Sequence, residues 1–221
     1  MSIIKQIRDK ELLIAVWKMD EPEVKLYELL GNSANSKRIR EECNQKFSSD
    51  ARKKEWLSVR VLLSQLLGEN VVVAYRANGE PFLVGSEKKV SISHTRDYVA
   101  VAISTLYHVG IDIEIFSHRV DSIVDKIMIR AEKAPKKLDA ESQTWHSLLV
   151  WSTKESVYKC LDIDTLDYKK GILISPFDLQ SQGEMKAQYT NYNYHYMLYV
   201  HYRCMEDFVL TWCSEYDLNG C

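Results

Sequence analysis

The sequence predicts an α+β protein, and three features support this fold class. Residues 12–17 (LLIAVW) form an apolar run of strand length. Residues 50–67 carry apolar side chains at helical spacing, and Gly68 follows them as a helix stop. Further along, Asn78-Gly79 separates two short apolar runs, which is a pattern typical of a β-hairpin.

The other elements of the first half follow in order. Asp20, Glu21 and Pro22 offer a helix start, and a polar helix is expected around 36–45. The strands expected after the hairpin are 90–94, 99–104 and 108–116.

The second half is again helical first and then rich in strands. The sequence predicts helix from about 120 to 160, interrupted at Pro135, and then strands at 172–174, 192–202 and 208–213. We therefore expect two halves of shared architecture, 1–116 and 117–221.

Composition excludes several classes of protein. With 46% hydrophobic and 27% charged residues among 221, the chain is expected to fold around a substantial core. Its net charge of −2 provides no basic field, and the longest apolar run near the N-terminus is too short for a bilayer, so neither nucleic acid nor a membrane is an expected partner. The five cysteines form no C-x-x-C pair, which favours a reducing, cytoplasmic compartment.

Residues 109–114 (VGIDIE) form the first of two acidic motifs. They read as a strand with Asp112 and Glu114 on one face, their Cα atoms about 6–7 Å apart. Both carboxylates could reach one hard cation, and magnesium fits best because it favours oxygen ligands. Gly110 is expected to leave space beside the acids for a ligand. The alternative, which alternation alone favours, is an ordinary strand with a solvated polar face.

Residues 151–159 (WSTKESVYK) form the second acidic motif. They read as a helix with Glu155 and Lys159 one turn apart. Apolar residues on both sides of these charges predict a helix buried between layers, where an acid and a lysine are costly unless paired or bound to a ligand. A site for metal and phosphate and a simple salt bridge are equally supported.

Residues 91–97 (SISHTRD) place Ser93 and His94 at a strand end, where donors can receive a phosphate. A single histidine is more often structural. No G-x-S-x-G elbow is present to support a Ser-His-Asp hydrolase.

Together and in this order, the three motifs resemble those of the 4′-phosphopantetheinyl transferase superfamily. The resemblance is to the larger, monomeric branch of the type that activates surfactin synthetase; it is sharp over 91–159 and weaker over 52–63. This family moves the phosphopantetheine arm of coenzyme A onto a serine of a carrier protein. The resemblance implies a pseudo-dimer of two similar α+β halves with the active site in the cleft between them. Coenzyme A would lie on the N-terminal half, and an acyl, peptidyl or aryl carrier protein on the C-terminal half.

The resemblance also implies roles for the matched residues. Asp112, Glu114 and Glu155 would hold Mg2+ with the pyrophosphate, and Glu155 would deprotonate the carrier serine. The implied catalytic residues are Glu155, Lys159 and Asp112, and the implied contacts to coenzyme A are Ser93, His94, Lys159, Arg52, Lys53, Gly79 and Pro81. The segment 116–141, rich in basic and apolar residues, is expected to dock the acidic helix of the carrier, with a core-packed helix as an equal alternative.

One position departs from the family pattern. Where members often have Gly-Lys-Pro before the Ser-His motif, this chain has Glu80 between Gly79 and Pro81. An acid facing the nucleotide would weaken coenzyme A binding, unless it points away or Arg76 or Lys88 compensates. This substitution motivates two alternative functions, a non-catalytic relative that binds coenzyme A or a carrier domain, and an unrelated α+β interaction domain.

Overall fold

The structure is a computed structural model that describes residues 3–9, 11–68, 71–161, 167–191, 195–215 and 218–220. Residues 218–220 are described by their backbone alone. It is mixed α+β, as predicted, and divides into two compact units, Met1–Leu106 and Tyr107–Cys221. The division falls before the expected boundary at 116, because β7 (Val109–Ile115) pairs with β11 (Phe208–Ser214) in the second unit.

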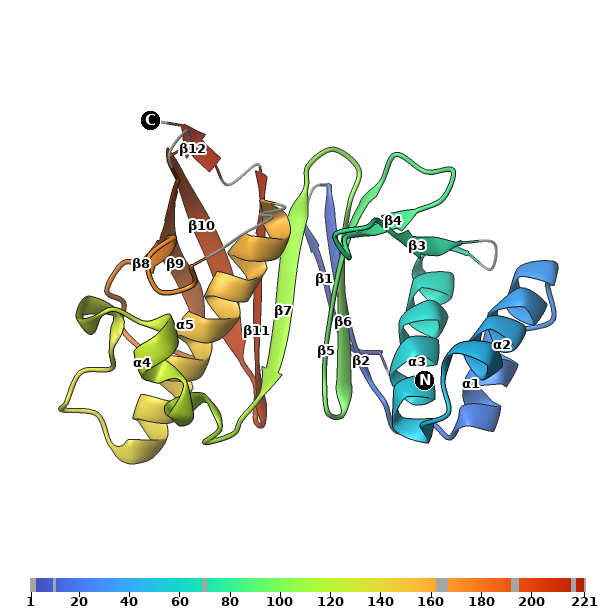
Figure 1. Cartoon of the computed structure of the whole chain (residues 1–221), viewed down its shortest axis with the longest axis horizontal. Coiled ribbons are helices and arrows are strands. Elements are labelled where there is room, and N and C mark those ends of the chain that lie inside the picture. Colours follow the sequence, from blue (N-terminus) through green and yellow to red (C-terminus); the bar gives the residue numbers. More distant parts are fainter. Residues whose placement is uncertain are drawn as a thin grey trace. The chain divides into compact units, whose positions relative to one another are not determined.

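The first unit is built on an antiparallel sheet in the order β1-β2-β6-β5 (Figure 1). Its strands are β1 (Ile3–Asp9), β2 (Leu12–Lys18), β5 (Lys89–Thr95) and β6 (Tyr98–Ser104). The predicted hairpin is confirmed: β3 (Val73–Tyr75) pairs with β4 (Pro81–Leu83). Gly79 in its turn has a φ of 90°, which glycine adopts without strain.

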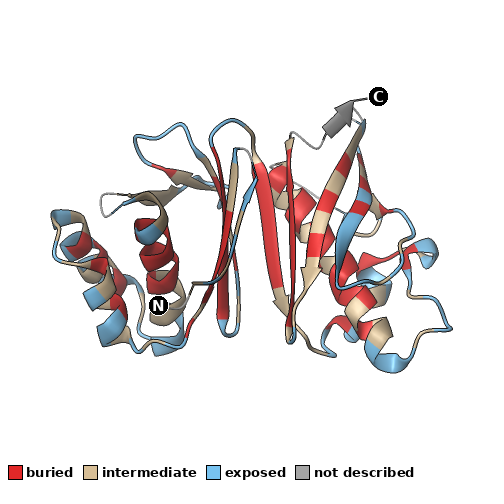
Figure 2. Ribbon diagram, turned by 180° about the vertical axis from the view of Figure 1, so that it is seen from behind, coloured by how far each residue is buried: buried red, intermediate tan, exposed pale blue. Residues whose placement is uncertain are grey.

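The helices of this unit are α1 (Glu23–Leu30), α2 (Ala34–Lys46) and α3 (Asp50–Leu67). Helix α3 packs on β2 and β6, and α1 and α2 pack on α3 (Figure 1). Gly68 ends α3 as predicted, with its N–H donating to the carbonyl of Ser64. The buried side chains of α3 join those of β2 and β6 in one core, and the buried side of α3 is red in Figure 2.

The second unit is built on an antiparallel sheet in the order β7-β11-β10-β9-β8. Its other strands are β8 (Ile172–Ile174), β9 (Gln182–Thr190), β10 (His195–Cys204) and β12 (Leu218–Gly220), which pairs with β10. The long helix α5 (Ala140–Cys160) packs along β7 and β11. None of the described helices combines the length and the apolar character needed to cross a bilayer.

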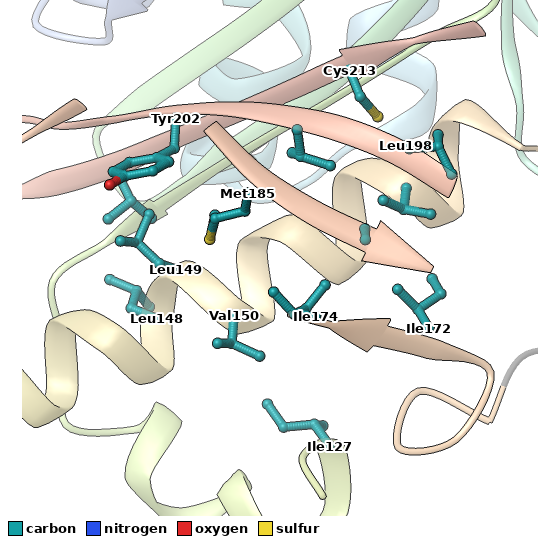
Figure 3. Packing of buried hydrophobic residues seen from close by; sticks show 14 of the residues in the cluster. Ile127, Leu148, Leu149, Val150, Ile172, Ile174, Met185, Leu198, Tyr202 and Cys213 are labelled. Carbon is teal, nitrogen blue, oxygen red and sulfur yellow. The ribbon is translucent and has the colours of Figure 1, made fainter. Parts of the chain in front are cut away.

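The core of this unit lies between α5 and the sheet. Figure 3 shows Leu149 and Val150 of α5 in the same apolar cluster as Ile174 and Met185. This packing holds α5 in a fixed register against the strands, and so positions the second acidic motif.

The prediction of helix from 120 to 160 is correct only for its C-terminal part. Residues before α5 form three short turns, η1 (Val120–Ser122), α4 (Val124–Ile127) and η2 (Arg130–Glu132). Val120, Ile127 and Met128 are buried in the core of the second unit. The expected apolar contribution of these three residues to carrier docking is therefore wrong, because their side chains pack inside the protein.

The two units share one pattern of connection. In the first, β2 leads through helices to the β5–β6 hairpin, and β6 returns to pair with β2. In the second, β7 leads through α5 to the β10–β11 hairpin, and β11 returns to pair with β7. The expectation of a pseudo-dimer of two similar halves around a cleft stays a prediction.

Candidate active site

Helix α5 approaches β7 most closely at Gly110. A Cβ atom at this position would lie 1.8 Å from the carbonyl oxygen of Ser156 and 2.8 Å from the backbone nitrogen of Cys160. Only glycine permits this contact. The expectation that Gly110 leaves space for a ligand is wrong, because the backbone of α5 fills that space. Its effect is to bring the second acidic motif onto the acidic face of β7.

Asp112 is 3% exposed and has two partners on α5. Lys159 Nζ lies 2.8 Å from Asp112 Oδ1, and Ser152 Oγ donates to Oδ2 at 2.8 Å. Lys159 also donates to the carbonyl oxygen of Ile111 at 3.2 Å. The two acidic motifs therefore meet, with the lysine of the second neutralising an acid of the first.

Buried hydroxyl groups fasten α5 beside this pair. Thr211 on β11 faces Asp112 across the strands, and its Oγ1 lies 2.9 Å from Ser152 Oγ and 2.6 Å from Ser156 Oγ. Ser156 Oγ also donates to the carbonyl oxygen of Thr211 at 3.0 Å. Because buried polar groups are costly without partners, these contacts specify one position of the helix on the sheet.

Glu114 lies two residues after Asp112, on the same face of β7. Its Oε1 accepts a hydrogen bond from Trp151 Nε1 at 2.9 Å. Burial, followed by the negative charge of Asp112, raises the pKa of Glu114 to about 7. This carboxyl is therefore poised to gain or lose a proton near neutrality.

Glu155 lies on α5 between the two partners of Asp112. Burial and then the charge of Asp112 raise its pKa, while Lys159 and a hydrogen bond from the Tyr168 hydroxyl act in the opposite direction. A carboxylate with a raised pKa is a better general base than an ordinary glutamate.

The three acids offer the donor type that Mg2+ prefers, and their charges favour a cation. The negative charge of Asp112 raises the pKa of both glutamates, so a bound cation would relieve this repulsion. Within the described ranges, no three His, Cys, Asp or Glu side chains are already gathered as a metal centre. Asp112 is bound to Lys159, and Glu114 to Trp151. The residues thus fit the ion by chemistry, and ligation would require these side chains to adjust.

Lys154, in the second motif, has a structural environment that sequence reasoning missed. Its side chain is 0% exposed and lies 2.9 Å from Glu132 Oε1. Glu132 is also fully buried, and it comes from the η2 turn 22 residues earlier. No local pattern signals this pair, because an i,i+22 contact depends on how the turns before α5 fold back over the helix.

Four of the expected coenzyme A contacts lie on α3 and β5 in the first unit, namely Arg52, Lys53, Ser93 and His94. Glu55 Oε2 on α3 pairs with Arg52 Nη1 at 3.0 Å and lies 4.0 Å from His94 Nδ1 on β5. Lys53 Nζ donates to Asn44 Oδ1 at 3.3 Å. Arg52 and His94 therefore both lie near Glu55, whereas Lys53 contacts α2.

The other expected contacts of the first unit lie in the β3–β4 hairpin, and Lys159 lies on α5. Ser93 is buried on β5, next to His94, and Gly79 and Pro81 flank the hairpin turn. Glu80 Oε2 pairs with Arg76 Nε at 2.8 Å. Arg76 therefore compensates the charge of Glu80, which is one of the possibilities that the sequence left open.

The second unit is thus an α+β unit in which three acids and a lysine from two separate motifs lie together. Within it, residues 108–213 match the sequence model of the 4′-phosphopantetheinyl transferase superfamily. This segment contains both acidic motifs.

Two curated proteins are also similar to this chain. One is the 4′-phosphopantetheinyl transferase AcpT of Salmonella typhimurium, 30% identical over 112 residues; the match covers 49% of this chain and 58% of that protein. The other is AcpT of Salmonella typhi, 30% identical over 118 residues with the same coverage. The chain thus spans little more than half the length of the curated relatives it matches. These matches support the resemblance at the level of the superfamily, and the surfactin-type branch stays a prediction.

Proposed function

We propose that this protein is a magnesium-dependent 4′-phosphopantetheinyl transferase that acts on an acyl, peptidyl or aryl carrier domain. One observation carries the proposal: α5 places Lys159 2.8 Å from Asp112 of β7, with Glu155 one turn before that lysine. The similarity over residues 108–213 covers this arrangement.

The proposed reaction is attack by the hydroxyl of a carrier serine on the phosphorus of coenzyme A that bears the pantetheine arm. A new P–O bond forms to the serine, the pyrophosphate P–O bond breaks, and 3′,5′-ADP leaves. Glu155 takes the serine proton, and its raised pKa suits this role. Lys159, whose side chain is 25% exposed, is accessible to neutralise phosphate charge.

Asp112, Glu114 and Glu155 would hold the magnesium ion. When bound, such an ion neutralises phosphate charge and orients the reacting groups. The protein's own contribution is to bring these acids together against α5, where Ser152 donates to Asp112 and Trp151 donates to Glu114.

For the first unit we propose contacts to coenzyme A. Arg52 and His94 gather around Glu55, and either side chain could exchange this acid for a phosphate group of the nucleotide. Lys53, Ser93, Gly79 and Pro81 belong to the same proposal, which rests on the family resemblance. We also propose that the protein acts as a monomer.

A panel of apo-carrier domains incubated with the purified protein, coenzyme A and magnesium tests the proposal. We expect intact-protein mass spectrometry to show addition of the phosphopantetheine arm, with stoichiometric release of 3′,5′-ADP. Chelation of the metal should stop the reaction, and Glu155→Gln serves as the inactive matched control.

The alternatives give different outcomes. Coenzyme A binding without modification of any carrier would favour a non-catalytic relative. Absence of both binding and turnover in a folded protein would favour an unrelated α+β interaction domain.

A further inference from the structure

Lys154 uses its whole hydrogen-bonding capacity inside the protein. Its Nζ donates to the carbonyl oxygens of Ile127 and Tyr168, both at 2.8 Å, and to Glu132 Oε2 at 3.0 Å. An ammonium group has three donors, and all three are engaged here. Since the side chain is also 0% exposed, it has no donor to offer a phosphate.

Glu132 completes this buried ion pair. Its Oε2 accepts from the backbone N–H of Ile129 at 2.9 Å, and its Oε1 accepts from the N–H of Ile174 at 2.8 Å. The pair therefore joins α5 to the η2 turn, to β8 and to the carbonyl of Tyr168. Separating the two side chains would leave a buried charge without a partner, which is strongly unfavourable. The pair therefore stays closed.

Tyr168 contacts both the Lys154–Glu132 ion pair and the helix that carries the candidate active-site residues. Lys154 holds its carbonyl, and its ring packs against Trp151 and Tyr158 of α5, with centroid distances of 5.3 and 5.7 Å. Trp151 and Tyr158 flank Glu155 on α5, so the ring lies over the part of the helix that carries this acid. Burial and then the negative charge of Glu155 raise the pKa of the Tyr168 hydroxyl. The backbone and the ring of Tyr168 are thus both fixed by α5, beside Glu155.

We propose that Tyr168 is a positioning residue that holds the Glu155 carboxylate in place, and that the buried Lys154–Glu132 pair sets the position of Tyr168. The proposal rests on the proposed function of Glu155 as the base. It separates the roles of the motif's two lysines: Lys159 faces the phosphate, and Lys154 acts on Glu155 only through Tyr168.

The physical reason lies in the precision that proton transfer requires. A base must lie within hydrogen-bond reach of the hydroxyl that it deprotonates, and a glutamate on a helix has three side-chain torsions to fix. One hydrogen bond from a rigid phenol restricts these torsions before substrate arrives. Removing that bond should slow turnover without weakening nucleotide binding.

Tyr168→Phe tests the hydroxyl, because it keeps the ring and its packing. We expect kcat to fall about tenfold, which corresponds to about 1.4 kcal/mol, with the KM for coenzyme A unchanged. Tyr158→Phe is the matched control: it removes a hydroxyl from the neighbouring ring, and kcat should stay unchanged. A kcat of Tyr168→Phe equal to that of the wild type, or a change confined to KM, would overturn the proposal.

The buried pair is tested with a neutral double variant, Lys154→Met with Glu132→Gln, because a single change could leave an unpaired buried charge and unfold the protein. We expect this variant to lose kcat as Tyr168→Phe does. Adding Tyr168→Phe to it should cause little further loss, since both act through one contact. Multiplicative losses would show that the pair does not act through Tyr168.

A measurement without turnover separates this inference from the proposed function. Urea unfolding of Tyr168→Phe, Glu155→Ala and their combination forms a double-mutant cycle, because each single change removes the contact. We expect the combined shift in midpoint to be smaller than the sum of the single shifts. If the cycle shows this coupling while no carrier is modified, the proposed function fails and the Tyr168–Glu155 contact stands. Additive shifts would overturn the contact itself.

Discussion

Lys159 Nζ lies 2.8 Å from Asp112 Oδ1, and the two side chains differ in exposure, 25% for the lysine and 5% for the aspartate. The lysine can therefore meet a ligand, while the acid is held in the interior. A phosphate would offer Lys159 a second anionic partner. If Lys159 turned from Asp112 to the phosphate, Asp112 would become available to a cation. The pair would then contribute to binding both the phosphate and the cation.

The first prediction concerns the acids. Asp112→Ala and Glu155→Ala should each lower turnover by about a hundredfold or more. The first change removes a negative charge from the proposed metal site, and the second removes the proposed base. Glu114→Ala should cost less, since water can replace one ligand of magnesium. Steady-state kinetics with a carrier substrate measures this, and circular dichroism checks the fold. Near-normal turnover of Asp112→Ala would show the metal-site assignment to be wrong.

The second prediction concerns the contact between Gly110 and α5. Gly110→Ala places a Cβ against the backbone of Ser156 and Cys160, so the helix must move. We expect a loss of about 1–3 kcal/mol in the free energy of unfolding, and lower turnover because α5 carries Glu155 and Lys159.

Gly183→Ala on β9 is its control, since the three atoms nearest to the new Cβ all belong to the Tyr202 side chain and not to the backbone, at 2.9 Å or more. Thermal unfolding and kinetics on both variants test the comparison. Equal behaviour would contradict the claim that Gly110 sets the position of α5.

The sequence predicted elements whose signals are local. The Asn78-Gly79 hairpin and the end of α3 at Gly68 were correct, because the backbone conformation itself selects those residues. Strand β1 was missed, since its exposed polar side chains hide the alternation on an edge strand. The region 120–139 was wrong because tertiary packing of its apolar residues, rather than their periodicity, decides their conformation.

The candidate site shows the same limit. Alternation placed Asp112 and Glu114 on one face of a strand, and helical spacing placed Glu155 beside Lys159. The partners that hold these groups, such as Thr211 and Tyr168, come from distant segments. No spacing rule links them to the motifs, so only the folded structure shows them.

The third prediction concerns stability at acid pH. His146 on α5 is 4% exposed and stacks on Phe177, and burial lowers its pKa to about 4, from 6.5. Between these values the unfolded chain binds the proton more readily than the folded one. The free energy of unfolding therefore falls as pH decreases from 6.5 to 4, by about 2 kcal/mol at pH 5 from this group.

His146→Phe should remove that contribution. Urea unfolding at pH 7 and pH 5 should show a smaller loss for the variant than for the wild type, by about 2 kcal/mol. His195→Phe, at an exposed position of β10, should lose as much as the wild type. If His146→Phe also matched the wild type, the buried neutral state of His146 would be refuted.

The fourth prediction concerns Glu80, which pairs with Arg76 in the β3–β4 hairpin. Glu80→Lys releases Arg76 and adds a cation, so the KM for coenzyme A should fall about tenfold, for a charge-assisted contact of about 1.5 kcal/mol. Glu87→Lys, an equal charge change at an exposed site, is the control. An unchanged KM for Glu80→Lys would place this side chain away from the nucleotide.

The last prediction concerns carrier docking by the exposed lysines that precede α5. Lys133, Lys136 and Lys137 are exposed before α5, and Lys133 pairs with Asp125. Carrier proteins of the implied kind present an acidic helix, so these lysines should accelerate encounter in a salt-dependent way. Changing all three to Glu should raise the carrier KM, most strongly at low salt, and leave the coenzyme A KM unchanged.

The matched control reverses three exposed lysines of the first unit, Lys25, Lys37 and Lys46, which gives the same change in net charge. Because steering depends on where charge lies and not only on its sum, this control should raise the carrier KM much less. Kinetics across a salt series distinguishes the two variants. Equal effects of both would attribute the change to net charge, and an effect of the control alone would move the docking surface to the first unit.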